Sequence, residues 1–138
     1  MTLSPCFVDT NVFVRYLTAD DAKKAKAVEK LLIRAGKGEI RLVTSPIVIA
    51  ELVWVLESFY KLDRADIAEL LEAILNTIGL KVDNSETVIT ALAIYQNDSI
   101  DYVDAYIIAH LRLREISTLY SYDKKHLSIF SDIKRVEP

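Results

Sequence analysis

Cysteine is nearly absent from this sequence, since Cys6 is the only one among 138 residues. A lone cysteine excludes an intramolecular disulfide and favours a reducing cell interior. Because Cys6 lies in the first strand-like segment and has no partner, we expect it to fill part of the core.

Long hydrophobic runs are also missing. The longest, from Ile47 to Leu56, is interrupted by Glu51 and is shorter than the about 18 residues that a membrane-spanning helix needs. The first residues lack the basic start and the apolar run of a signal peptide. We therefore expect a soluble, cytoplasmic protein with no membrane partner.

An excess of positive charge is absent as well. The 17 basic and 20 acidic residues give a formal net charge of -3, whereas nucleic-acid-binding proteins usually carry a basic surface. A nucleic acid would therefore have to be bound by local groups of cations. Hydrophobic residues make up 51% of the chain, and no linker, repeat or low-complexity segment appears. We expect one domain, residues 1–138.

Short β-branched segments alternate with longer segments of helical period, a pattern typical of an α/β domain. We predict a mostly parallel, twisted central sheet flanked by helices. The expected strands are residues 6–10, 40–45, 80–82, 117–121 and 133–137. The expected helices are residues 11–17, 20–35, 46 to about 60, 65–79, 85–96 and about 102–115, with a short turn at 123–127. A helical hairpin is expected at about 46–78.

Four acidic residues occupy positions that local propensity does not favour. Asp9 follows the first strand, Glu51 lies inside the apolar run, Asp104 begins "DAYIIAHL", and Asp123 follows "TLYSY". Three of them have a local explanation, because acids are common at helix starts. Glu51 does not, since it lies about six residues into its helix, beyond the first turn where the dipole acts. Its apolar neighbours predict a buried carboxylate that needs a metal ion, a lysine or an arginine nearby.

Topology predicts that these four carboxylates meet. The strands of a parallel sheet end on one edge, and ligands bind in the crevice beyond those ends. Asp9 and Asp123 come off strand ends, while Glu51 and Asp104 lie near the starts of helices that open on the same edge. Carboxylates placed close together repel unless a cation compensates. Oxygen ligands favour hard ions, so Mg²⁺ or Mn²⁺ is predicted and Zn²⁺ is not.

The segments "FVDTNVFVRYL", "TSPIVIAEL", "DYVDAYIIAHL" and "LYSYDKKH" resemble the PIN domain, a nuclease family that includes the VapC-type toxins of toxin–antitoxin pairs. The resemblance covers nearly the whole chain. It implies that Asp9, Glu51, Asp104 and Asp123 are the catalytic metal ligands, and that Asn11 and Ser45 are polar residues beside them. Ser121 stands where the family often has threonine. Asp101 is an additional acid, either a supporting ligand or, as we prefer, a helix cap.

The expected activity is that of a metal-dependent endoribonuclease. A carboxylate cluster that holds Mg²⁺ or Mn²⁺ suits hydrolysis of a phosphodiester by metal-activated water, without a protein nucleophile. Arg15, Lys124 and Lys125 are candidates for contacts to the phosphates of RNA, because they are close in sequence to site residues. His110 is interpreted as a packing residue and His126 as a surface residue, and neither is needed for the site.

Partners are suggested by aromatic residues on the helix of Glu51. Trp54, Phe59 and Tyr60 add more apolar area than a chain of this size readily covers, which favours a homodimer face or a groove for a partner. In the toxins that this chain resembles, dimers are usual and a small antitoxin protein inserts a segment near the acidic site. The resemblance therefore implies an antitoxin that presents arginine or lysine to the carboxylates.

Two alternatives remain. A signalling receiver domain also binds Mg²⁺ with acids at strand ends, but it needs adjacent acids after the first strand and a lysine after the last, where this chain has "VDTN" and "SYD". A non-catalytic module that binds RNA or protein is less favoured, because all four acids are present. RNA and single-stranded DNA are both compatible substrates, since external water rather than a 2′-hydroxyl is the nucleophile.

Overall fold

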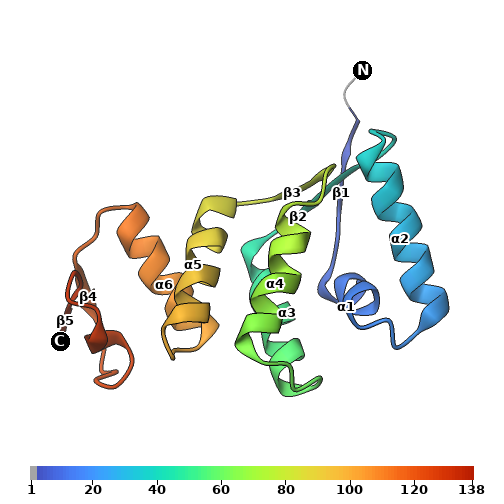
Figure 1. Ribbon diagram of the computed structural model, residues 1–138. Helices are drawn as coiled ribbons and strands as arrows, with labels where there is room; N and C mark the ends of the chain where they lie inside the picture. The colour runs from blue at the N-terminus through green and yellow to red at the C-terminus, as the bar shows by residue number, and fades with distance from the viewer. Residues whose placement is uncertain (1–2) are drawn as a thin grey trace. The chain divides into compact units, whose positions relative to one another are not determined.

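Three short parallel strands form the sheet in the first part of the chain (Figure 1). The computed structural model describes residues 3–138, and β1 (Pro5–Phe7), β2 (Arg41–Thr44) and β3 (Leu80–Val82) pair in the order β1-β2-β3. Cys6 lies opposite Leu42, which lies opposite Leu80. Both pairings are parallel because each connection contains two helices, which return the chain to the same edge. The predicted parallel α/β sheet is confirmed.

Four helices accompany this sheet. The chain between β1 and β2 forms α1 (Thr10–Thr18) and α2 (Ala22–Gly36), and the chain between β2 and β3 forms α3 (Pro46–Ser58) and α4 (Arg64–Leu75). The α1 helix packs against both α2 and α3, and α4 packs against α3 and β3 (Figure 1). The predicted helical hairpin is therefore present as α3 and α4.

A glycine allows the end of α2 to approach β3 closely. Gly79 has a φ of 89°, in the left-handed region that glycine adopts readily. A Cβ atom at this position would lie 2.2 Å from the carbonyl oxygen of Ala35 in α2. The absence of a side chain at Gly79 therefore sets the spacing between α2 and the start of β3.

The chain divides into two compact units, the first reaching to Ser85 and the second running from Glu86 to Pro138. The α5 helix (Ser85–Asn97) leads into the second unit, where α6 (Tyr102–Leu113), β4 (Thr118–Tyr120), a 3₁₀ turn η1 (Leu127–Ile129) and β5 (Lys134–Val136) follow. The β4 and β5 strands pair in parallel, with Leu119 opposite Arg135. All five predicted strands are present.

The structure corrects two expectations about the first unit. Cys6 is exposed rather than part of the core, and its neighbour Phe7 in β1 is 59% exposed. The α4 helix ends at Leu75 rather than at residue 79 as expected, so Ile78 lies beyond it and is exposed. Across the described residues, no helix combines the length and the hydrophobicity needed to cross a membrane.

Candidate active site

The edge of the first sheet at which its strands end carries polar residues. Asp9 follows β1 by two residues, and Ser45 and Asp83 directly follow β2 and β3, so the strand register places all three just beyond this edge. The buried hydroxyl of Thr44 donates a 2.9 Å hydrogen bond to the carbonyl of Val8, which joins β1 and β2 there. Parallel topology therefore brings Asp9 and Ser45 to one edge.

Asp9 and Glu51 line one cavity of ≈ 310 Å³, which we call the α1–α3 cavity. Asn11 and Arg15 are among the other polar residues that line it. Asp9 is also the N-cap of α1, where its carboxylate accepts a 2.7 Å hydrogen bond from the backbone N–H of Thr10. The capping interaction and a place beside Glu51 are thus compatible for Asp9.

The prediction that Glu51 is buried is wrong. Its side chain is exposed, although its helix is strongly apolar. The buried residues of α3 are Val48, Ile49, Leu52, Val53 and Leu56. Glu51 lies on the other side of the helix with Ile47 and Trp54, because residues three and four apart share a helix face. Glu51 is a candidate site residue because it lines the same cavity as Asp9, and not because it is buried.

Arg15, a predicted phosphate contact, has an acidic partner within the protein. Its Nη1 atom lies 3.3 Å from Oδ1 of Asp20, whose carboxylate also accepts hydrogen bonds from the hydroxyls of Thr18 at 3.1 Å and Tyr60 at 2.7 Å. The hydrogen bond from Tyr60 is the largest cause that lowers the pKa of Asp20 below its ordinary value. Asp20 therefore connects two residues that line the α1–α3 cavity.

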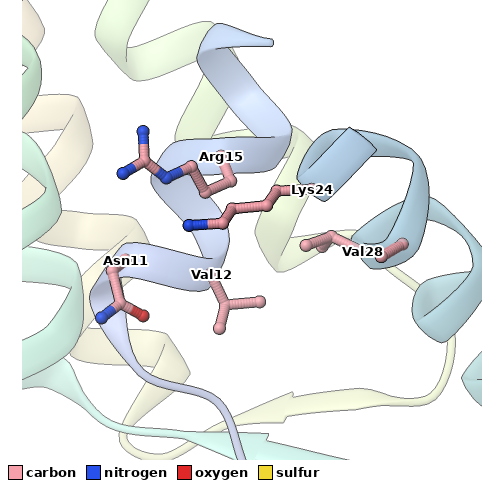
Figure 2. Close-up of a pocket in the computed structure, with 6 residues that line it drawn as sticks. Asn11, Val12, Arg15, Lys24 and Val28 are labelled. Atoms are coloured by element: carbon pink, nitrogen blue, oxygen red, sulfur yellow. The ribbon is translucent and has the colours of Figure 1, made fainter. Parts of the chain in front are cut away.

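A second cavity of ≈ 330 Å³ lies between α1 and α2 and shares Asn11 and Arg15 with the first. Figure 2 shows Lys24 extending from α2 toward α1, where Asn11 and Arg15 lie. The ammonium of Lys24 is 4.0 Å from the carboxylate of Asp21. Arg15 therefore lines both cavities, and Lys24 lines the second. The sequence analysis singled out Arg15 but not Lys24.

In the second unit, Asp104, Asp123 and His126 form a cluster. One oxygen or nitrogen ligand atom from each lies within 4.8 Å of the others. Asp104 is in the first turn of α6, and Asp123 follows β4. The Asp123 carboxylate accepts a 2.9 Å hydrogen bond from the backbone N–H of His126, and its other oxygen lies 3.6 Å from Nδ1 of that histidine. Asp104 and Asp123, two of the four carboxylates that are predicted to meet, therefore lie together within the second unit.

The two carboxyl groups of this cluster have opposite electrostatic settings. Burial raises the pKa of Asp104 above its ordinary value, and the nearby charges of Asp101 and Asp123 raise it further, whereas His126 opposes the shift. The pKa of Asp123 is lowered, mainly because the backbone N–H of His126 donates to its carboxylate. A cation placed between them would relieve the repulsion that Asp104 experiences.

Residues predicted to support the site have identifiable contacts. Asp101 is the N-cap of α6, since its carboxylate accepts a 2.8 Å hydrogen bond from the N–H of Asp104. The hydroxyl of Ser121 accepts a 3.0 Å hydrogen bond from the N–H of Asp123. Ser45 occupies the N-cap position of α3 without capping it, and its buried hydroxyl oxygen has no protein partner. Capping therefore explains Asp101 but not Ser45.

The two lysines after Asp123 both have exposed side chains, but only Lys125 also contacts Asp123 through its backbone. Both side chains are exposed, and the backbone N–H of Lys125 donates a 3.0 Å hydrogen bond to the Asp123 carboxylate. That bond helps to fix the carboxylate, whereas the charged ends of Lys124 and Lys125 are available to solvent.

Sequence reasoning missed two residues near these groups. His126 was interpreted as a surface residue outside the site, yet it lies against Asp123 and Asp104. Its spacing of three residues after Asp123, with a tight turn between, was the available signal. Asp83, at the end of β3, was missed because the strand is short and the acid resembles an ordinary turn residue.

Comparison with known proteins finds a similar curated protein and a similar solved structure. The VapC ribonuclease of Aquifex aeolicus (strain VF5) is 25% identical over 118 residues, which cover 86% of this chain and 87% of the relative. A second comparison finds a crystal structure of VapBC2 from Rickettsia felis bound to a DNA fragment from the promoter of the pair. The alignment covers 97% of this chain and 98% of that chain, with a TM-score of 0.39 and 17% identity.

The family assignment follows from a match along almost the full sequence. The family model described as the PIN domain matches residues 6–135. This range includes both carboxylate groups, Asp9 with Glu51 and Asp104 with Asp123. This chain therefore belongs to the PIN domain family.

Proposed function

We propose that this protein is a Mg²⁺- or Mn²⁺-dependent endoribonuclease and the toxin of a VapBC-type toxin–antitoxin pair that acts in the cytoplasm. The observation that carries the proposal is the pairing of the predicted acids within each unit of a PIN domain chain, Asp9 with Glu51 and Asp104 with Asp123. A relative that is named a VapC ribonuclease supports the same activity.

The donor set suits a divalent metal ion. Asp104, Asp123 and His126 offer two carboxylates and one imidazole whose ligand atoms lie within 4.8 Å of one another. Carboxylate oxygens suit Mg²⁺ and Mn²⁺, and an imidazole is more typical of transition metals, which favours Mn²⁺ at this cluster. The proposal assigns Asp9, Glu51, Asp104 and Asp123 as metal ligands, with His126 as an additional candidate.

The supporting residues would orient these ligands. Ser45 has a buried hydroxyl without a protein partner, and a buried polar group of this kind is usually satisfied by water or a ligand. Asn11 lines the α1–α3 cavity beside Asp9 and Glu51. Asp101 and Ser121 hold the backbone of Asp104 and Asp123. Loss of a residue that positions a metal ligand typically reduces affinity or activity by about 10- to 100-fold.

The proposed chemistry is phosphodiester hydrolysis without a protein nucleophile. A bound divalent ion lowers the pKa of water and neutralises charge on the phosphate. The carboxylates hold the ion in place, and Asp123, fixed by the backbone N–H groups of Lys125 and His126, presents its oxygens in one orientation. Arg15, Lys124 and Lys125 would contact the RNA phosphates, which an acidic protein must bind locally.

The proposal includes two protein partners. An antitoxin that presents arginine or lysine to Asp9 and Glu51 would block the α1–α3 cavity by charge complementarity. A homodimer would cover the exposed aromatic residues on and after the helix of Glu51, of which Trp54 is 60% exposed and Phe59 is 78% exposed.

The proposal is tested by cleavage of a labelled RNA with Mg²⁺, with Mn²⁺ and with EDTA. We expect the wild type to cut only when a metal ion is present. Asp9→Asn and Asp104→Asn, one from each carboxylate group, should each lose more than about 100-fold in rate, beyond the usual loss for a supporting residue. Glu29→Gln, an exposed acid on α2 outside both groups, is the matched control.

Two results would contradict the nuclease assignment. Cleavage that survives chelation would exclude metal dependence. Equal cleavage by the wild type and both aspartate variants would show that the carboxylates are not used. RNA binding without any cleavage would instead support a non-catalytic module of the same fold.

A further inference from the structure

The segment between β4 and β5 contacts both ends of α6. Near the start of the segment, Asp123 and His126 lie close to Asp104 in the first turn of α6. Near its end, Asp132 binds Arg112, which lies in the last turn of the same helix. Along the helix axis Asp104 and Arg112 are about 12 Å apart, because each residue adds about 1.5 Å. The segment therefore extends along α6 from the candidate metal ligands to an arginine with no role so far.

Arg112 binds the end of this segment through three contacts. Its Nε and Nη2 atoms donate hydrogen bonds of 2.7 and 3.0 Å to the two carboxylate oxygens of Asp132. Its guanidinium carbon lies 5.2 Å from the centre of the Phe130 ring, within the range of a cation–π contact. The hydrogen bond from Arg112 lowers the pKa of Asp132 below its ordinary value. A bidentate contact of this kind fixes an orientation as well as a distance.

Other contacts of the segment do not fix its position along α6. The pairing of β4 with β5 joins its two ends to each other, since the N–H of Ser121 donates to the carbonyl of Val136. Leu127 and Phe130 are buried, but hydrophobic burial has no preferred direction. The ion pair of Arg112 is thus the directional contact between the end of the segment and α6.

We propose that Arg112 is a positioning residue for the metal site of the second unit, which holds Asp123 and His126 close to Asp104 before a metal ion binds. The inference rests on the proposed function, because it assumes that this cluster binds the ion. Asp104 and Asp123 repel each other while no cation lies between them, and the contact at Arg112 opposes their separation. A ligand set that is ordered in advance loses less conformational entropy on binding.

Two variants distinguish positioning from a simple effect of charge. By charge alone, Arg112→Met should strengthen the binding of a cation and Asp132→Asn should weaken it. Positioning predicts weaker Mn²⁺ binding in both variants, by about 2- to 30-fold, the range for coupling through a network of contacts. The double variant should lose no more than the more affected single variant, because both changes break the same contact. Arg112→Lys retains the charge without the planar fork and should recover only part of the affinity.

Metal binding at this cluster can be followed through the ring of His126, because the chain has only two histidines. Mn²⁺ is paramagnetic and broadens the NMR signals of a ring beside it, so a titration reports the affinity of the cluster itself. Arg114→Met is the matched control, since Arg114 is an exposed arginine at the same end of α6 whose side chain contacts His110. It should leave the affinity unchanged.

A second measurement needs no metal ion. The backbone N–H groups of Lys125 and His126 donate to the Asp123 carboxylate, and their hydrogen exchange reports how firmly this turn is held. In EDTA, both groups should exchange faster in Arg112→Met than in the wild type or in Arg114→Met. The amide of Ile108, in the buried face of α6, reports global unfolding separately.

The outcomes separate this inference from the nuclease assignment. If the wild type binds Mn²⁺ without cutting RNA, and Arg112→Met binds Mn²⁺ more weakly, the positioning role stands and the nuclease function fails. If the wild type cuts RNA but Arg112→Met binds Mn²⁺ as tightly as the wild type or more tightly, the positioning role is overturned. Lower global stability with unchanged Mn²⁺ affinity would make the ion pair a structural contact only and would overturn it too. Mn²⁺ that leaves the His126 ring of the wild type unaffected would overturn it whether or not RNA is cut.

Discussion

At the scale of single residues, Asp20 joins three side chains of the first unit. Its carboxylate receives hydrogen bonds from Tyr60, Thr18 and Arg15, and these lower its pKa below the ordinary value of 3.8. Its side chain is 41% exposed, so screening by solvent limits the energy of these contacts. The network matters because it orders two residues of the α1–α3 cavity.

The Tyr60–Asp20 hydrogen bond gives a pH-dependent prediction. Because the folded-state pKa of Asp20 is lowered, its contribution to the free energy of unfolding is present above the ordinary pKa and disappears as the pH falls through the folded-state value. Tyr60→Phe should move the pKa of Asp20 back toward 3.8, since Tyr60 is the largest cause of the shift. Carboxyl carbon NMR measures both values.

The matched control is Tyr16→Phe, which removes a hydroxyl on the same helix as Arg15 without touching Asp20. It should leave the titration of Asp20 unchanged. An Asp20 pKa that is the same in the wild type and in Tyr60→Phe would show that the hydrogen bond is not formed in solution.

Individual site residues were only partly predictable from the sequence. Asp9 and Asp104 were identified because acids directly beyond strand ends or at helix starts have a known geometry. The exposure of Glu51 was not predictable, because the exposed face of α3 also carries Ile47 and Trp54 and therefore gives no polar stripe. His126 was missed because its contact with Asp123 depends on a turn rather than on a helical or strand period.

At the scale of elements, Asp101 caps the start of α6, and substitutions can test this capping role separately from a role in metal binding. Asp101 accepts a hydrogen bond from the N–H of Asp104, as an N-cap residue does. Asp101→Ala should therefore lower the free energy of unfolding by about 1 kcal/mol. Asp101→Asn retains an acceptor at the cap and should have a much smaller effect, as measured by urea unfolding.

The same pair of variants tests whether Asp101 is also a ligand. Asp101→Asn removes a negative charge that raises the pKa of Asp104, so that pKa should fall. If Asp101 is only a cap, Mn²⁺ affinity measured by calorimetry should change by less than about threefold, consistent with one screened charge. A decrease of about 100-fold or more in Asp101→Asn would establish it as a ligand.

The contact between α2 and β3 predicts opposite effects for two glycines. Gly79→Ala would place a Cβ against the backbone of Ala35 at a positive φ, and should lower the free energy of unfolding by more than about 1 kcal/mol. Gly36→Ala, at the end of α2, meets no atom closer than 3.9 Å and should stabilise by about 0.4–1 kcal/mol. Thermal and urea unfolding measure both, and equal effects would contradict the close approach.

The presence of each helix and strand was predicted more accurately than the residue at which it ends. The short strands β3 and β4 were recognised because β-branched or aromatic residues stand between turns, and α3 because Pro46 follows a capping position. The end of α4 was placed too late, since Ile78 continues the apolar spacing although the helix stops at Leu75. The spacing of apolar residues does not reveal that the chain already turns at Asn76 and Thr77, before Gly79.

At the scale of the whole molecule, the acidic balance limits how nucleic acid can be bound. With 17 basic against 20 acidic residues, no general attraction to a polyanion exists. The cations near the carboxylate groups are themselves partly neutralised, Arg15 by Asp20 and Lys24 by Asp21. Composition could predict that binding must be local, but not that these arginine and lysine side chains line neighbouring cavities on α1.

Salt dependence measures how many phosphates of the nucleic acid the protein neutralises. For a single strand, removing one cation that binds a phosphate should reduce the slope of log affinity against log salt by about 0.7. We expect Arg15→Gln and Lys24→Gln each to lower the slope by about this amount, because both line the openings beside α1. Lys30→Gln, an exposed lysine on α2 outside both cavities, should leave it unchanged. Equal slopes in all three variants and the wild type would mean that phosphates are bound elsewhere, with Lys124 and Lys125 the next residues to replace.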